Sequence, residues 1–177
     1  MKFNRTKTSF GRHETFPLRY GWLTKGLEAI RRTPDLLTQP ESAMIALGVG
    51  RNMVNALQYW LGVTGMVEFK EGIGAPTALG ETLLGDAGDP YLEDEATLWI
   101  IHWLIAANAE LATGFYWFFN HFASPSFQDQ DALYAIGEFA ERELRIRRAQ
   151  TTLKSDISTL LRMYAPAAGR TDDHLDS

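Results

Sequence analysis

The sequence predicts a mainly α-helical protein that begins with a winged helix-turn-helix unit and continues with a helical unit. Apolar residues repeat with helical spacing in residues 41–47 and again in residues 51–61, and glycines at positions 48 and 50 separate the two runs. Glycine adopts the positive φ that a sharp corner between two helices needs. Two short runs, residues 67–70 and 75–77, then read as strands around a glycine-containing turn, which completes the order of a winged helix.

A helix over residues 22–32 is expected to come first in this unit. Leu23, Leu27 and Ile30 share one face, and the last turn is cationic, as the helix dipole favours. A Thr-Pro-Asp sequence then ends the helix, because proline cannot continue it. The first helix of a three-helix core is therefore predicted here, and its outward Lys25 is a candidate phosphate contact.

The second and third helices supply further candidate DNA contacts. The second helix is expected to bury four apolar residues: Ala43, Ile45, Ala46 and Leu47. The third helix carries four polar residues on its outer face: Arg51, Asn52, Asn55 and Gln58. Arginine reaches phosphates and guanine edges, and the amides of asparagine and glutamine can pair with adenine in the major groove. Winged helices also serve as protein–protein modules, so that alternative stays open.

A short helix is expected to close the winged unit. Thr77 would cap its beginning, and three leucines would face inward: Leu79, Leu83 and Leu84. A linker rich in glycine and aspartate follows at residues 85–90. The chain is therefore expected to divide into three parts: an N-terminal arm and winged-helix unit at residues 1–88, a helical unit packed on it at residues 89–166, and a flexible tail at residues 167–177. The chain is also expected to be the front part of a longer protein.

Residues 96–123 are largely apolar. The unbroken apolar portion is too short for a membrane span and is interrupted by His102 and Asn108. Two buried helices joined near Asn108 are predicted instead, with Asp94 capping the first. The aromatic residues of this region are expected to form core or an oligomer seam: Trp99, Trp103, Tyr116, Trp117 and Phe118. A homodimer is expected on this ground.

Two further helices are predicted over residues 129–141 and 151–164. Basic residues lie in the connection between them and on the second helix, and they are candidate phosphate contacts: Arg145, Arg147, Arg148 and Lys154. The two helices fit a second helix-turn-helix, but simple helical packing predicts the same apolar pattern. Both interpretations stay open.

Composition excludes several classes of protein. The chain of 177 residues is 45% hydrophobic and 12% aromatic, enough for a substantial core, so most of it is not disordered. It has no cysteine, which excludes disulfide scaffolds, thiolate zinc sites and cysteine nucleophiles. The N-terminus has no apolar segment typical of a secretory signal, and a cytoplasmic location is expected.

Charge is unevenly distributed along the chain. The net charge is −5, yet residues 1–51 hold nine Lys or Arg against four acids. Residues 68–141 hold thirteen acids against Lys70 alone. A basic front of this kind is compatible with nucleic acid, and the acidic middle is expected to be a solvated or partner-facing surface rather than a metal site.

The densest group of chemically useful side chains lies near the N-terminus. Arg12, His13 and Glu14 are consecutive, and Arg19 and Tyr20 follow closely. Histidine and glutamate bind metal or exchange protons, arginines clamp phosphate, and tyrosine attacks phosphorus in some nicking enzymes. The alternative is that the histidine and glutamate hydrogen-bond a loop while Arg19 pairs with an acid. No Walker loop, GxGxxG or GxSxG motif is present.

Several segments together resemble a bacterial domain-of-unknown-function family of the SspB type, from DNA phosphorothioation systems. The matching segments are HETFPLRYGW at residues 13–22, LGVGRNMV at 47–54, DPYLED at 89–94, TLW at 97–99, HWL at 102–104 and TLKSD at 152–156. These systems replace a backbone phosphate oxygen with sulfur, and the SspB type is associated with nicking DNA for that insertion. Family members usually continue well past the position of Ser177, so residues in that further part are not carried here.

The resemblance and the residue patterns together give three functional hypotheses. The first is a DNA-binding module of a phosphorothioation protein in anti-phage DNA modification. The second is a DNA nickase that uses Mg²⁺ or Mn²⁺, with His13, Glu14 and Tyr20 as candidate catalytic residues. The third is a scaffold that dimerises and recruits sulfur-transfer partners without cleaving DNA. The implied partners are DNA and the other proteins of the system, namely a cysteine desulfurase, an ATPase and an ATP-pyrophosphatase-like sulfur-transfer enzyme.

Overall fold

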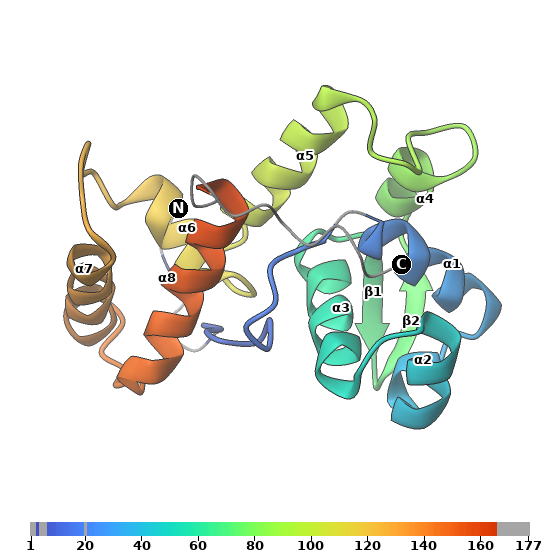
Figure 1. Ribbon diagram of the computed structural model, residues 1–177, viewed down its shortest axis with the longest axis horizontal. Helices are drawn as coiled ribbons and strands as arrows, with labels where there is room; N and C mark the ends of the chain where they lie inside the picture. Colours follow the sequence, from blue (N-terminus) through green and yellow to red (C-terminus); the bar gives the residue numbers. More distant parts are fainter. Residues whose placement is uncertain (1–2, 4–6, 20, 166–177) are drawn as a thin grey trace.

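The protein is mainly α-helical, as predicted. The computed structural model describes residues 3, 7–19 and 21–165, and within them eight α-helices, one short 3-10 helix and one two-stranded hairpin occur (Figure 1). The elements in chain order are α1 (Trp22–Arg32), η1 (Leu36–Thr38), α2 (Pro40–Leu47), α3 (Arg51–Val63), β1 (Val67–Lys70), β2 (Ile73–Pro76), α4 (Ala78–Leu84), α5 (Glu95–Ala106), α6 (Thr113–Asn120), α7 (Asp129–Arg142) and α8 (Gln150–Tyr164).

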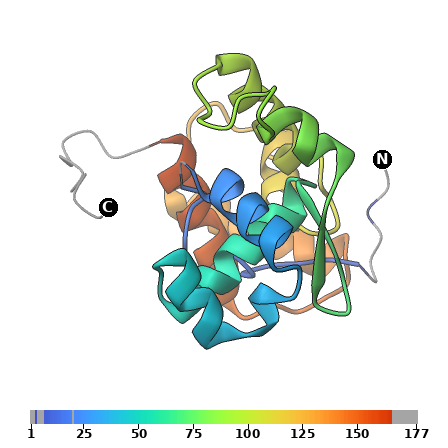
Figure 2. The same cartoon turned by 90° about the vertical axis from the view of Figure 1, so that its right-hand side faces the viewer.

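Helices α1 to α3 pack together with the hairpin around the larger of two cores. Leu23, Leu27 and Ile30 of α1 are buried, as their spacing predicted. Helix α1 lies across α3 (Figure 2). At the centre Trp60 of α3 is fully buried, and its indole N–H donates to the carbonyl oxygen of Phe16 at 3.1 Å. This bond satisfies the only polar atom of the side chain, so the largest core residue also ties the N-terminal segment to α3.

Side-chain hydrogen bonds fix the beginnings of two helices, and backbone conformation fixes the turn of the hairpin. The side chains of Thr77 and Asp94 accept hydrogen bonds from Gly80 N at 3.0 Å and Ala96 N at 2.8 Å, so both predicted N-caps are confirmed. In the hairpin, Lys70 pairs with Ile73, and the two turn residues between them both have positive φ. This is the backbone that a two-residue hairpin turn requires.

Helices α6 to α8 enclose a second, smaller core. Ile136 of α7 and Ile157 of α8 are buried there beside Trp117 of α6. Phe10 joins this core, and Ser9 N donates to the Thr113 hydroxyl at 2.9 Å. Residues 7–12 of the N-terminal arm are therefore placed by this core, and they cross from it toward α1 (Figure 1).

Some predicted inward positions are exposed. Ile45 of α2 is 85% exposed, and Ala46 is also exposed. Only Ala43 and Leu47 of this eight-residue helix are buried. Leu79, at the start of α4, is 39% exposed. In both cases a short helix has one narrow inner stripe, and an apolar residue beside that stripe stays in solvent.

The aromatic residues of α5 and α6 divide into two groups. Tyr116 and Trp117 of α6 are buried, whereas Trp99 and Trp103 of α5 are exposed. Across the described residues, no helix combines the length and the apolar character needed to cross a membrane. The division of the chain near residue 88 stays a prediction.

Candidate nucleic-acid interface

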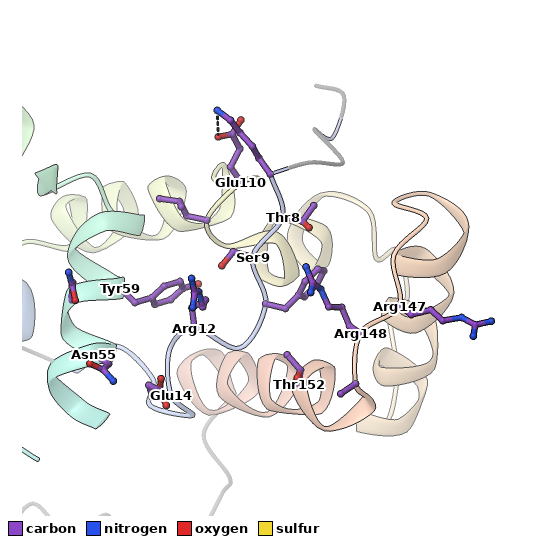
Figure 3. A pocket seen from close by; sticks show the side chains of 15 residues that line it. Thr8, Ser9, Arg12, Glu14, Asn55, Tyr59, Glu110, Arg147, Arg148 and Thr152 are labelled. Atoms are coloured by element: carbon purple, nitrogen blue, oxygen red, sulfur yellow. Dashed lines mark ion pairs between the residues drawn. The ribbon is translucent and has the colours of Figure 1, made fainter. Parts of the chain in front are cut away.

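A cleft of about 1150 Å³ lies where the N-terminal segment, α3, α8 and the loop before α8 meet (Figure 3). We call it the basic cleft. Its lining residues are Lys7, Thr8, Ser9, Phe10, Arg12, Glu14, Asn55, Gln58, Tyr59, Glu110, Leu111, Arg147, Arg148, Ala149 and Thr152. Asn55 and Tyr59 project from α3 on one side, and Thr152 projects from α8 on the other. The cleft is therefore formed by segments that are far apart in the sequence.

Cations exceed acids along the cleft. Four Lys or Arg side chains line it, against Glu14 and Glu110. Lys7 pairs with Glu110 at 3.5 Å, and both side chains are at least half exposed. Within residues 7–19 and 21–165, no carboxylate lies within 4.0 Å of the guanidinium groups of Arg12 or Arg148. Exposed cations of this kind are available to an anion.

A buried hydrogen-bonded pair, His13 and Asp156, holds the segment that carries Arg12. Asp156 of α8 accepts hydrogen bonds at Oδ1 from His13 Nε2 at 2.7 Å and from Gly11 N at 2.9 Å. The side chains of His13 and Asp156 are both almost completely buried. Arg12 lies between the two bonded residues and is itself exposed. The anchor thus fixes the backbone on both sides of Arg12 while its guanidinium stays in the cleft.

The hydrogen bonds also define the form of the histidine ring. Thr15 N donates to His13 Nδ1 at 3.1 Å, so Nδ1 carries no proton. The proton must then lie on Nε2, which donates to Asp156, and the imidazole is neutral. Gly114 of α6 allows the close approach of Asp156, since a Cβ at this position would lie 3.0 Å from Oδ2.

Tyr59 provides a phenol at the α3 wall of the cleft. Its pKa is raised above the ordinary value, first because the side chain is buried and second because the charge of Asp156 disfavours a second negative charge. The phenol therefore stays protonated and available as a hydrogen-bond donor. Tyr59 follows Asn55 by one helical turn, so both side chains lie on the same face of α3.

Six of the residues singled out in the sequence meet in this cleft. They are Arg12, Glu14, Asn55, Gln58, Arg147 and Arg148. In Figure 3 the side chain of Arg148 is directed toward the N-terminal segment, whereas that of Arg147 is directed away from the cleft. The structure thus brings the polar face of α3 and the basic connection before α8 to one place.

The other candidate residues lie elsewhere. Arg51 lines a separate hollow of about 230 Å³ with residues 39–42 at the start of α2. Arg19 lies over the rings of Phe16 and Trp22, at 6.0 and 5.7 Å from their centroids. The alternative pairing of Arg19 with an acid is not observed among the described residues. Four further candidates are exposed and are not among the cleft-lining residues: Lys25, Asn52, Arg145 and Lys154. Tyr20 lies outside the described residues.

Sequence reasoning missed several residues of the cleft. Lys7, Thr8 and Ser9 were assigned only to the N-terminal arm, and Thr152 carried no distinct signal. Tyr59 could have been found, because it stands four residues after Asn55 on the same face of α3. His13, by contrast, is 0% exposed, and its partner lies 143 residues away in the sequence. Its catalytic role stays a prediction, and direct contact with a phosphate would require the ring to leave its buried position.

Comparison with known proteins agrees with the resemblance drawn from the sequence. The family model described as "Protein of unknown function (DUF4007)" matches residues 10–177. A structure described as "SspB crystal structure" is 28% identical with a TM-score of 0.83, and the match covers 98% of this chain and 55% of that chain. A second structure, described as "Magnesium ion-bound SspB crystal structure", is 29% identical with a TM-score of 0.78, and the match covers 88% of this chain and 49% of that chain. This chain thus spans about half the length of the SspB chains it matches. Comparison with curated proteins gives no match.

The described part of the chain contains no cluster of metal-ligating side chains. Among the described residues, no three His, Asp or Glu side chains lie close enough together to hold a metal ion. The acids before α5 have another role: Asp89 accepts from Glu93 N at 2.9 Å and Asp94 N at 3.0 Å. These bonds from backbone N–H groups lower the pKa of Asp89. Asp89 therefore stabilises the loop before α5, and Asp94 caps the helix itself.

Proposed function

We propose that this chain, which belongs to the DUF4007 family, is a DNA-binding module of a DNA phosphorothioation protein related to SspB. The observation that carries the proposal is the basic cleft, which is lined both by Arg12 and Arg148 and by the amides of Asn55 and Gln58 on α3. Cationic side chains neutralise phosphates, and amides read base edges, so the cleft combines the two kinds of contact that DNA recognition uses.

The order of elements around α3 supports a winged helix-turn-helix as the binding element. In this proposal α2 and α3 form the helix-turn-helix, and the β1–β2 hairpin is the wing. Asn55 and Gln58 would approach the bases from α3. Arg51, at the other end of the exposed face, would contact the backbone together with Asn52. The basic connection before α8 would hold the phosphates opposite α3, whether or not α7 and α8 act as a second helix-turn-helix.

A role in DNA nicking would belong to the whole protein. One similar SspB structure is described as magnesium-bound, but the described residues of this chain form no metal site. The proposed contribution of this part is to hold DNA, within a system that would also contain a cysteine desulfurase, an ATPase and a sulfur-transfer enzyme.

Fluorescence anisotropy of a labelled duplex, titrated at several salt concentrations, tests the proposal. The Arg12→Ala/Arg148→Ala variant is expected to bind roughly tenfold more weakly or worse, because two charged hydrogen-bond donors are lost. The slope of log affinity against log salt should fall by about 2, since two fewer counterions are released. Both side chains are exposed, so the fold should be unaffected.

Two control variants sharpen this experiment. Arg32→Ala removes an exposed cation at the end of α1, outside the cleft, and should leave affinity and slope unchanged. Glu110→Gln removes a cleft carboxylate and frees Lys7, so it should tighten binding by roughly twofold to threefold. Equal weakening by Arg32→Ala and Arg12→Ala/Arg148→Ala would mean that binding depends on overall charge and not on the cleft.

A second candidate function is that of an interaction scaffold. One observation favours it, namely the exposure of Trp99 and Trp103 on α5, at 69% and 68%. A homodimer through this surface was predicted from the sequence, and sedimentation velocity over a range of concentrations measures it directly. A monomer at all concentrations would exclude the dimer.

A further inference from the structure

Helix α5 is apolar on both of its sides. Beyond Glu95 it contains no Asp, Glu, Lys or Arg up to Ala106. Its inner side contributes Ile101 and Ile105 to the larger core. A helix that is apolar all round is normally covered on all sides, so the outer side of α5 needs an explanation.

The outer side forms a continuous exposed stripe, which we call the α5 aromatic face. It consists of Ala96, Trp99, Ile100, Trp103 and Ala107, all exposed. The spacing of three and four places these residues in line along the helix, and twelve residues span about 18 Å. This is the length and pattern of the seam between two packed helices. Two tryptophans in one such stripe are far more apolar surface than scattered exposure explains.

Aromatic rings pack beneath the Trp99 part of the face. The ring of Trp99 makes an edge contact with His102, with centroids 5.7 Å apart. His102 Nδ1 in turn lies 3.0 Å from the hydroxyl oxygen of Tyr164 at the end of α8, and Phe119 of α6 packs against both rings. The surface is therefore preformed, which lowers the entropy lost when a partner binds.

Charge at one end of the face identifies the kind of partner. Glu93, Asp94 and Glu95 are all exposed at the N-terminal end of α5, and no basic residue lies in its last turn. A second copy of α5, packed in either direction, would bring no cation opposite these acids. A helix with lysine or arginine at one end would complement both the apolar stripe and the acidic end.

We propose that the α5 aromatic face docks an amphipathic helix of a partner protein, with cationic residues opposite residues 93–95. Its apolar side would cover Trp99 and Trp103, in the manner of a helix lying along a hydrophobic surface. The inference does not depend on DNA binding, because none of the five residues of the face lines the basic cleft.

A labelled 14-residue peptide of leucine and lysine, patterned as an amphipathic helix, serves as the probe. Fluorescence anisotropy should report saturable binding, whereas the matched leucine–glutamate peptide should not bind. Unlabelled peptide should also shift the tryptophan emission of the wild type to the blue, since Trp22, Trp60 and Trp117 are already buried and only the exposed pair can respond. The Trp99→Ala/Trp103→Ala variant should bind the peptide at least tenfold more weakly.

Three variants make the result specific. Glu93→Gln/Glu95→Gln should weaken binding of the lysine peptide and reduce its salt dependence. Tyr134→Ala is the matched control, because Tyr134 is an aromatic residue of α7 that is 71% exposed and lies outside the face. This variant should bind the peptide as the wild type does. Ile100→Glu introduces a charge into the face and should also abolish binding, which covers the case that the double alanine variant fails to fold.

Three outcomes would overturn the proposal. The first is unchanged peptide affinity in Trp99→Ala/Trp103→Ala and Ile100→Glu. The second is equal binding of the leucine–glutamate peptide, which would remove the role of the acidic end. The third is a dimer in sedimentation velocity that the tryptophan variant abolishes, which would make a second copy of this chain the occupant.

Discussion

The basic cleft and the α5 aromatic face differ in how they are built. The cleft is concave and is assembled from the N-terminal segment, α3, and the region around the start of α8. The α5 aromatic face lies along a single helix. The cleft therefore exists only when distant segments are held in place, whereas the aromatic face needs little more than a correctly docked helix. Different perturbations should consequently damage the two surfaces.

The two surfaces also attract ligands by different forces. Four cations line the cleft, so its binding should weaken steeply as salt screens charge. The aromatic face acts mainly through burial of apolar surface, which salt affects little, and only its acidic end adds an electrostatic contribution. Variants and conditions that separate these behaviours can sharpen the comparison or contradict it.

The largest expected effect comes from Asp156→Ala. The substitution removes the acceptor of two hydrogen bonds and leaves the His13 Nε2–H buried without its partner. The free energy of unfolding should fall by about 3 kcal/mol or more. Urea unfolding measures this loss. In the fraction that remains folded, DNA binding should weaken because the segment carrying Arg12 loses its anchor, while peptide binding to α5 should persist.

Asp35→Ala provides the control for this prediction. Its carboxylate is exposed and accepts a hydrogen bond from the Gln39 side chain at 2.8 Å. Loss of this surface contact should change the free energy of unfolding by about 0.5 kcal/mol at most. If Asp156→Ala were as mild as Asp35→Ala, the buried pair would not be the support of the cleft.

A smaller effect is expected from the titration of His102, which lies beneath the aromatic face. Burial lowers the pKa of His102 below its ordinary value near 6.5. As pH falls below about 6.5, the unfolded chain binds a proton that the folded chain resists, so stability decreases. The contribution is fully present above this pH and is lost as pH falls through the folded pKa.

Urea unfolding of the wild type and His102→Gln at pH 7.5 and pH 5.5 measures this effect. The wild type should lose more stability than the variant over this interval, because the variant has no group at position 102 that takes up a proton. Equal losses in the two proteins would show that His102 is not the titrating group. The affinity of the cleft for DNA should change with pH by the same amount in the wild type and in His102→Gln.

Local features of the sequence predicted the fold well. The helix over residues 22–32 has the bounds that its amphipathic pattern predicted, and Thr77 and Asp94 cap the helices that follow them. These features depend on neighbours within a few residues, so the sequence contains all the information they need. The predicted burial of Ile45 and Leu79 was wrong, because the burial of a residue also depends on how far the neighbouring element extends.

The cleft could be predicted only in pieces. The polar face of α3 and the basic residues 145–148 were both candidates, but nothing in their spacing brings them together. The anchor of the cleft is a contact between His13 and Asp156, 143 residues apart, and two such residues look like any exposed pair in the sequence. The exposed side of α5 was left undecided, because the apolar pattern fits both a helix buried in the core and a helix that presents a surface to a partner.

The most direct measurement uses the absence of cysteine in the chain. A single cysteine is introduced by Thr8→Cys in the cleft or by Ile100→Cys on the aromatic face. The rate of maleimide labelling is then measured with and without duplex DNA and with and without the leucine–lysine peptide. DNA should slow labelling at position 8 and not at position 100, and the peptide should do the reverse. Protection of position 100 by DNA while position 8 stays reactive would contradict the assignment of the cleft as the DNA-binding surface.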